Sequence, residues 1–280
     1  MFSFIANIFG YLLKWLYNIV GGSYGIAIIL FTIILRIILL PITIKQQKSI
    51  KKTSELQGKM QEIQFKYKNN PEQMNKEVMD LYKRENVSPF SGCISAIVQL
   101  VIILSVFWLV SKPLTYMNHV SSETIENYKN EIVEENGSIS NYYEIEIIQK
   151  KSEQNEDVRI NMDFFGLDLS KVPSQNLGDF KVYIIPILYV ISSILSIRLT
   201  TGSKSKKGEE NPNDMTQQMN KSMSYIMPIM AVSIAFVAPL GLAMYWFISN
   251  VLMIIERLLI NKYTEHTDKS QARPRLTEPK

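Results

Sequence analysis

The sequence predicts an all-α polytopic membrane protein, with five transmembrane helices around a hydrophilic groove and a cytoplasmic helical hairpin. Its 280 residues include 56 charged side chains, yet four apolar segments that together contain 94 residues hold only one of them, Arg36. Uncharged segments of this length match the roughly 20 residues that a helix needs to cross about 30 Å of hydrocarbon. An ordinary soluble fold is therefore excluded.

The apolar segments divide into five predicted spans. The last segment is too long for one crossing at about 1.5 Å per residue, and Pro239 with Gly241 interrupts it near its middle. It is therefore expected to form two spans joined by a tight turn. In chain order, the predicted spans are residues 24–44, 93–111, 182–200, 223–238 and 240–257.

The segments between the spans predict the orientation in the membrane. Basic residues outnumber acidic ones in the hairpin segment (45–88), in a loop (201–222) and in the C-terminal tail (258–280). The remaining segment, residues 112–181, has seven basic and thirteen acidic residues. Because basic segments stay in the cytoplasm, the N-terminus is expected outside the cell, the acidic loop extracellular and the C-terminus cytoplasmic.

Residues 1–20 predict an amphipathic helix that lies on the outer leaflet. Asn7 and Lys14 fall on one helical face, whereas Ile8 and Leu12 fall on the other. No Lys or Arg precedes Lys14 and no small-residue cleavage site follows it, so a cleaved signal peptide is not expected. An uncleaved signal-like segment is the alternative.

Residues 45–88 predict a helical hairpin. Leu56, Met60 and Ile63 recur at helical spacing, and Asn70 with Pro71 can cap and begin a second helix. The apolar stripe is narrow, so we expect a thinly packed, mobile arm that receives a partner or substrate. A simple cytoplasmic loop is the alternative.

The acidic loop is expected to be flexible and without catalytic function. Tyr143, Ile145 and Ile147 alternate with acidic residues, and this pattern predicts a strand that pairs with residues 158–164. A lone two-stranded element is only marginally stable. The C-terminal tail, which is polar and contains prolines, is expected to be disordered.

Arg36 is the strongest single signal in the sequence. It lies twelve residues from the start of its predicted span and eight from the end. An arginine at that depth costs at least about 2.5 kcal/mol and is tolerated mainly beside water or a partner. The apolar segments contain no Asp or Glu that could pair with it. Arg36 is therefore expected to face a water-filled cavity without an intramembrane ion pair.

Other polar side chains in the predicted spans could line that cavity. Each of them alone is more often a bridge between packed helices, but together with Arg36 they favour a groove. These residues are Thr32, Thr43, Ser95, Gln99, Ser192, Ser196, Tyr245, Ser249 and Asn250.

Enzymes and metalloproteins are poorly supported. A single cysteine, Cys93, excludes an intramolecular disulfide, and two isolated histidines leave little for a metal site. The motifs of nucleotide-binding loops and zinc proteases are absent from the sequence. No catalytic residue, metal or cofactor is therefore expected.

Four segments are similar to segments of the YidC family of membrane protein insertases. Each is short, but their order around a charged helical hairpin is specific. The similar segments are Ile33 to Pro41, Val87 to Cys93 with Gln99, Phe165 to Leu169, and Leu240 to Trp246 with Asn250.

The resemblance implies a five-helix core around a groove that opens to the cytoplasm and to lipid. Arg36 would be the cation of this groove, and Tyr245 with Trp246 would lie near the helix that contacts substrate. The implied function is a membrane protein insertase and chaperone, working alone or with the Sec translocon in the bacterial plasma membrane. Nascent membrane proteins, lipids and the ribosome are the implied partners, with no nucleic acid binding of its own.

Two alternatives remain open at this point. A small-solute or anion transporter, or a channel subunit, would use Arg36 as an anion site. A purely structural assembly subunit or chaperone would tolerate replacement of Arg36.

Overall fold

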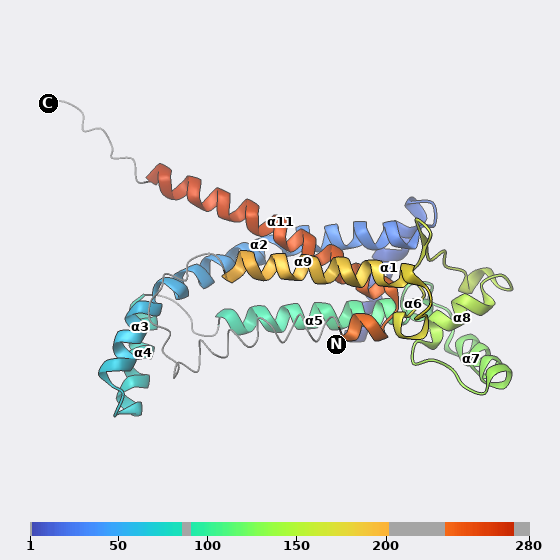
Figure 1. Cartoon of the computed structure of the whole chain (residues 1–280), viewed down its shortest axis with the longest axis horizontal. Coiled ribbons are helices and arrows are strands. Elements are labelled where there is room, and N and C mark those ends of the chain that lie inside the picture. The colour runs from blue at the N-terminus through green and yellow to red at the C-terminus, as the bar shows by residue number, and fades with distance from the viewer. Residues whose placement is uncertain (1, 86–90, 202–232, 272–280) are drawn as a thin grey trace. The chain divides into compact units, whose positions relative to one another are not determined.

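The computed structural model describes residues 2–85, 91–201 and 233–271, and these residues are mostly helical (Figure 1). The helices are α1 (Phe2–Ile19), α2 (Tyr24–Glu55), α3 (Gln57–Lys66), α4 (Pro71–Arg84), α5 (Ser91–Ser111), α6 (Pro113–Tyr116), α7 (Ser122–Asn136), α8 (Tyr143–Lys151), α9 (Ile184–Thr201) and α11 (Leu240–Gln271). Most of the predicted span at 223–238, the loop at 201–222 and the end of the tail lie outside the described residues.

Three of the described helical segments are long and apolar enough to cross a membrane. They are Tyr24–Ser49, Phe180–Leu199 and Leu240–Ile260, and a shorter apolar helix covers Ile97–Ser111. The predicted class, an all-α membrane protein, is thereby confirmed. The count of five spans stays a prediction.

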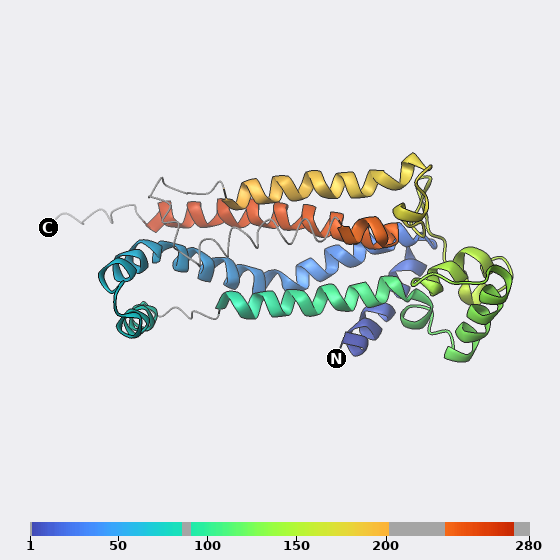
Figure 2. The ribbon, with the colours of Figure 1, turned by 60° about the horizontal axis from the view of Figure 1, so that its bottom comes forward.

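The chain forms two compact units, and α2 and α5 contribute to both. Of the described residues, one unit contains 3–36 and those from 106 onward, and the other contains those between 37 and 105. Within the first unit, α9 and α11 pack along each other, which Figure 2 shows as a yellow helix beside a red one. Helix α11 carries the side chains that contact Arg36. Other polar side chains of α9 and α11 bond to each other and join the two helices.

The second unit contains the helical hairpin of α3 and α4. The Asn70 side chain accepts a hydrogen bond from the Gln73 backbone N–H, and Pro71 begins α4. The predicted cap is therefore confirmed. Leu56 and Leu81 form the small buried core of the hairpin. This core is surrounded by the partly buried side chains of Met60, Ile63 and Tyr82.

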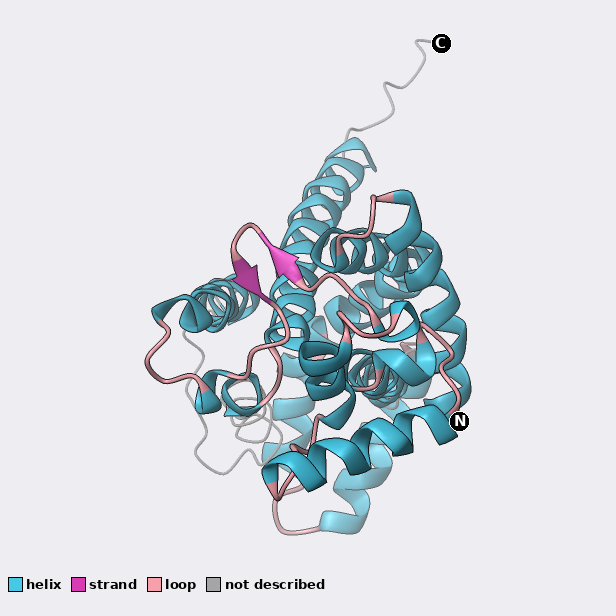
Figure 3. Cartoon of the chain, turned by 90° about the vertical axis from the view of Figure 1, so that its right-hand side faces the viewer, coloured by secondary structure: helices cyan, strands magenta, loops and turns pink. Residues whose placement is uncertain are grey.

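Residues 113–183, which we name the loop subdomain, form a folded element of the first unit. Besides α6, α7 and α8, it contains two short antiparallel strands, drawn in magenta in Figure 3. These are β1 (Asp163–Phe164) and β2 (Leu167–Asp168), with three 3-10 turns, η1 (Glu156–Val158), η2 (Pro173–Gln175) and η3 (Phe180–Tyr183). The subdomain has helices and an aliphatic core, whereas the sequence predicted only a small two-stranded element; its flexibility stays a prediction. The core includes Ile125, Ile132, Ile145, Ile147, Ile148, Val158, Ile160, Met162, Leu169 and Val172.

The predicted strand at residues 143–147 was wrong, because this segment forms helix α8. The alternation of apolar and acidic residues is short. Glu144, Ile147, Ile148 and Lys151 instead recur at helical spacing, and all four are buried. A helix can bury this set against α7 and α6, whereas a strand would turn half of it to solvent.

Helix α1 docks against the loop subdomain through a glycine. A Cβ atom added at Gly10 would lie 1.8 Å from the backbone oxygen of Tyr116, so only glycine allows this approach. Lys14 Nζ donates a hydrogen bond to Asn118 Oδ1 at 2.8 Å. The opposite face exposes a stripe of large apolar side chains, namely Phe4, Ile8, Tyr11, Trp15 and Ile19. Contact of this stripe with the outer leaflet stays a prediction.

Candidate functional site

Arg36 lies on the apolar part of α2 and reaches α11. Its Nη2 atom donates hydrogen bonds to the backbone oxygen of Ser249 at 2.9 Å and to Ser249 Oγ at 2.6 Å. Only 14% of the arginine side chain is exposed. Both bonds are charge-assisted and well within hydrogen-bonding range, so Ser249 fixes the position of the guanidinium group.

A carboxylate also lies near Arg36, contrary to the prediction from the sequence. Arg36 Nη1 is 3.6 Å from Glu256 Oε2, and 12% of the Glu256 side chain is exposed. The prediction failed because it considered only the uncharged segment, which ends at Ile255, although the predicted span at 240–257 already includes Glu256 and α11 continues unbroken to Gln271. Glu256 follows Ser249 by seven residues, which places both on the same helical face.

A second polar cluster joins α9 to α11. Asn250 Nδ2 donates hydrogen bonds to Ser192 Oγ at 3.1 Å and to Ser193 Oγ at 3.0 Å. Ser192 Oγ itself donates to the backbone oxygen of Tyr189 at 2.9 Å. All three residues of the Asn250 cluster are buried, so their polar groups bond to one another across the two helices.

Of the remaining predicted site residues that the structure describes, Tyr245 interacts with Ser249 and Arg36, and the others do not join this Arg36 cluster. Thr32 is buried one turn before Arg36, and its hydroxyl donates to the Ile28 backbone oxygen on its own helix. Tyr245 is buried one turn before Ser249, and the half-buried Trp246 has its ring centroid 6.3 Å from that of Tyr189. The half-buried Ser196 follows Ser192 by one turn on α9, whereas Gln99 belongs to the other compact unit.

The structure therefore brings together some of the predicted residues and adds others. Ser192 and Asn250 meet directly, and Arg36 meets Ser249, another of the predicted polar residues. Reasoning from the sequence missed Ser193 and Glu256. Glu256 lies within the predicted span at 240–257, so its seven-residue spacing to Ser249 could have marked it. The hydrophilic groove around Arg36 stays a prediction.

The loop subdomain holds the start of α11. The backbone N–H groups of Leu240 and Gly241 donate to the backbone oxygens of Lys171 and Leu169, each at 2.9 Å. The first N–H groups of a helix have no partner within the helix, so these bonds satisfy them. Two of the segments that resemble the YidC family, Phe165 to Leu169 and Leu240 to Trp246, thus meet at this point.

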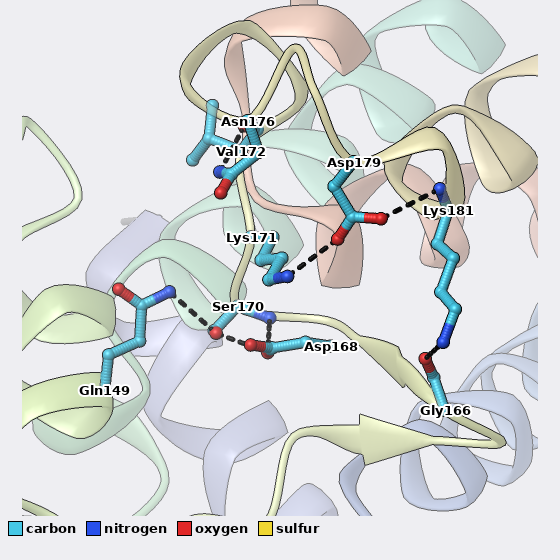
Figure 4. Close-up of polar contacts among 9 residues, drawn as sticks. All are labelled: Gln149, Gly166, Asp168, Ser170, Lys171, Val172, Asn176, Asp179 and Lys181. Carbon is cyan, nitrogen blue, oxygen red and sulfur yellow. Dashed lines mark hydrogen bonds and ion pairs between the residues drawn. The ribbon is translucent and has the colours of Figure 1, made fainter.

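Side chains brace the backbone that receives α11 (Figure 4). Gln149 Nε2 donates to Ser170 Oγ at 2.8 Å, and the Ser170 N–H donates to Asp168 Oδ1 at 3.0 Å. Lys171 Nζ lies 2.7 Å from Asp179 Oδ2. The hydrogen bond from Lys171 lowers the pKa of Asp179 most, and a hydrogen bond from the Lys181 backbone N–H lowers it further. The hydrogen bond to Asp179 in turn raises the pKa of Lys171. These contacts hold the N-terminal end of α11. Ser249 and Glu256, which contact Arg36, lie further along the same helix.

Two further features bear on chemistry. Among the described residues, no group of three or more His, Cys, Asp or Glu side chains could hold a metal ion. A polar cavity of about 1120 Å³ lies in the loop subdomain, between α8 and the segments 159–163 and 168–176. Its lining does not include Arg36, so the cation on α2 is a separate site.

Comparison with known proteins finds one family that matches most of the chain. A family model described as "60Kd inner membrane protein" matches residues 15–268. A protein of Treponema denticola named "Membrane protein insertase YidC" is 27% identical over 258 residues, which cover 92% of this chain and 37% of that protein. The chain thus spans little more than a third of that relative.

Other relatives have a length similar to that of this chain. An Oceanobacillus iheyensis protein with the same printed name is 28% identical over 264 residues, which cover 91% of this chain and 83% of the relative. A Fusobacterium nucleatum protein with that name is 27% identical over 263 residues, which cover 93% of this chain and 98% of the relative. The similarity therefore extends across almost the entire chain.

Proposed function

Because the chain belongs to the 60Kd inner membrane protein family, we propose that it is an insertase that helps newly made membrane proteins to enter the lipid bilayer. The relatives carry the name of that activity, and the apolar helices make this chain a multi-pass protein of a bacterial membrane. The single observation that carries the proposal is a half-buried arginine on an apolar helix, held by α11 with 14% of its side chain exposed.

The physical problem for such a protein is the transfer of polar groups. A peptide group that enters hydrocarbon without a hydrogen-bond partner costs several kcal/mol. A polar, hydrated path into the membrane would lower this cost over part of the distance. Arg36 would attract acidic residues of the incoming segment, in surroundings where water and salt screen the charge only weakly.

The apolar part of the substrate would supply the driving force. As its polar segment passes Arg36, its apolar segment would move along α9 and α11 into lipid, where burial of apolar surface is favourable. Exposed apolar side chains on these helices, such as Ile191, Leu195 and Met253, suit such a contact. The transfer makes and breaks no covalent bond, so we propose no chemical step, metal or cofactor.

The finer features of the proposal concern partners and orientation. We propose an extracellular N-terminus and a cytoplasmic C-terminus, which would make the hairpin of α3 and α4 cytoplasmic. There, its thin core and charged surface suit a first contact with the emerging chain, alone or beside the ribosome and the Sec translocon.

Reconstitution tests the proposal. Purified full-length protein in liposomes should insert a single-span substrate with an acidic tail, scored by protection of the tail from added protease. Empty liposomes and liposomes with heat-denatured protein are the controls. Insertion no greater than in empty liposomes would contradict the proposal.

A further inference from the structure

Arg36 and Glu256 form an ion pair that leaves part of each group's bonding capacity unused. The Nη1 to Oε2 distance of 3.6 Å exceeds the 2.7 Å between Lys171 and Asp179 in the same unit. Charge-assisted hydrogen bonds are typically about 2.7 to 2.9 Å long, so the Arg36 pair is an electrostatic contact without a hydrogen bond.

The guanidinium group does not depend on Glu256 for its position. Among the described residues, its hydrogen bonds run to Ser249 alone and start from Nη2. The Nη1 side is therefore available to a carboxylate, whether that carboxylate belongs to this chain or to another. Arginine offers several donors in a fixed plane, which suits the exchange of one carboxylate for another.

Glu256 is poorly satisfied where it lies. Its Oε2 atom is buried and accepts no hydrogen bond within the described part of the chain, so Arg36 is its main compensation. A buried carboxylate oxygen without a hydrogen bond is costly even beside a positive charge. Glu256 is the first charged residue after the apolar segment, so a change of side-chain rotamer can carry its carboxylate toward water.

From these contacts we propose that Glu256 is a resident counterion, which occupies Arg36 between substrates and which an acidic side chain of the substrate displaces. The inference rests on the proposed insertase function. In the exchange, the substrate carboxylate takes the Nη1 side of Arg36, and Glu256 keeps its negative charge as it turns to water. Glu256 thereby makes Arg36 selective for acidic tails, since neutral and basic tails gain no interaction by displacing it.

Neutralising Glu256 tests this competition. We expect Glu256→Gln to raise insertion of an acidic-tailed substrate by about two- to fivefold, the range for a partly exposed ion pair, with no change for a neutral-tailed substrate. Glu134→Gln removes an exposed carboxylate on α7 and is the matched control. Thermal unfolding of each purified variant, compared with wild type, gives its folded fraction.

Exchange of the two charges provides a second test that does not depend on Glu256→Gln being stable. The double variant Arg36→Glu with Glu256→Arg keeps the pair, and its preference should turn from acidic to basic tails. An equal change in insertion of both substrates by Glu256→Gln, or an unchanged preference in the exchanged variant, would overturn the counterion role while leaving the insertase function intact. If wild type inserts neither substrate, the insertase function itself fails, and the counterion role fails with it.

Discussion

The loop subdomain and the surroundings of Arg36 use charge in opposite ways. In the subdomain, Lys151 lies 3.0 Å from Glu131 and 3.1 Å from Glu135, and these hydrogen bonds raise the pKa of the lysine. At the membrane-spanning helices, Arg36 lies 3.6 Å from Glu256 and is fixed by a neutral serine. Lys151 and its two glutamates satisfy one another's charges, whereas the Nη1 side of Arg36 makes no hydrogen bond within the described residues.

This difference separates charges that stabilise the fold from one that can act on a substrate. Glu144 serves the fold through hydrogen bonds and not through its charge, because its two oxygens accept the Thr115 backbone N–H at 2.9 Å and the Thr115 hydroxyl at 2.6 Å. Its removal should damage the fold and leave substrate preference unchanged. The following experiments test the comparison, from the largest expected effect on stability to the smallest.

Glu144→Ala should be the most destabilising change in the loop subdomain. It would leave the half-buried Thr115 N–H without a partner at the start of α6, at a cost of about 2 to 3 kcal/mol in the free energy of unfolding. Chemical denaturation of the purified protein measures this loss, with the exposed Glu134→Ala as control. Equal stability of both variants would mean that the subdomain does not depend on this buried carboxyl group.

The stability of the protein should also depend on pH through the Glu144 carboxyl group. Burial raises the pKa of Glu144 above its ordinary value of 4.5, although the hydrogen bonds from Thr115 oppose this shift. A raised folded-state pKa means that the protonated group contributes stability, fully present below about 4.5 and lost as the pH rises through the folded-state pKa. Unfolding measured across this range should show the decline in wild type and a smaller one in Glu144→Gln. The same slope in both would assign the dependence to other groups.

Gly10→Ala should detach α1 from the loop subdomain. The new methyl group would lie 1.8 Å from the Tyr116 oxygen, and overpacking of this kind costs about 1 to 3 kcal/mol. Limited trypsin digestion at Lys14 should become faster, because its contact with Asn118 would be lost. Gly58→Ala, where nothing lies within 4 Å of the added atom, is the control. Equally slow digestion in both variants would show that α1 can move without loss of its contacts.

Asn250→Ala should have the smallest effect on stability. Its two hydrogen bonds to α9 lie between membrane-spanning helices, where such bonds contribute about 0.6 to 1.7 kcal/mol. A double-mutant cycle with Ser193→Ala measures the coupling between the two side chains. Additive effects would show that the contact does not join α9 to α11 and would return Asn250 to the set of candidate groove residues.

The sequence predicted the features that depend on local pattern. The membrane class followed from the placement of charge, and the cap at Asn70 followed from its position before Pro71. The strand at residues 143–147 failed, because a few alternating residues cannot outweigh the tertiary contacts that select a helix. The close approach at Gly10 depends on a partner more than a hundred residues away in the chain, and no local pattern contains it.

The site was predicted only in part, for a similar reason. Arg36 stands out because a charge in an apolar segment is rare. Its partners did not stand out, since a serine in a membrane helix is common and Glu256 lies just beyond the apolar segment. Hydropathy marks where a segment prefers lipid, whereas hydrogen bonding decides where a helix ends.

The most direct measurement of the central claim compares wild type with Arg36→Lys, Arg36→Ala and Arg36→Glu in liposomes, at equal amounts of folded protein. Each is scored for insertion of a single-span substrate with an acidic tail, by protection of that tail from protease. If the charge of Arg36 attracts the substrate, Arg36→Lys should retain insertion, and Arg36→Glu should reduce it by about tenfold or more through repulsion. Equal insertion by all four proteins would contradict the claim and remove Arg36 from the mechanism.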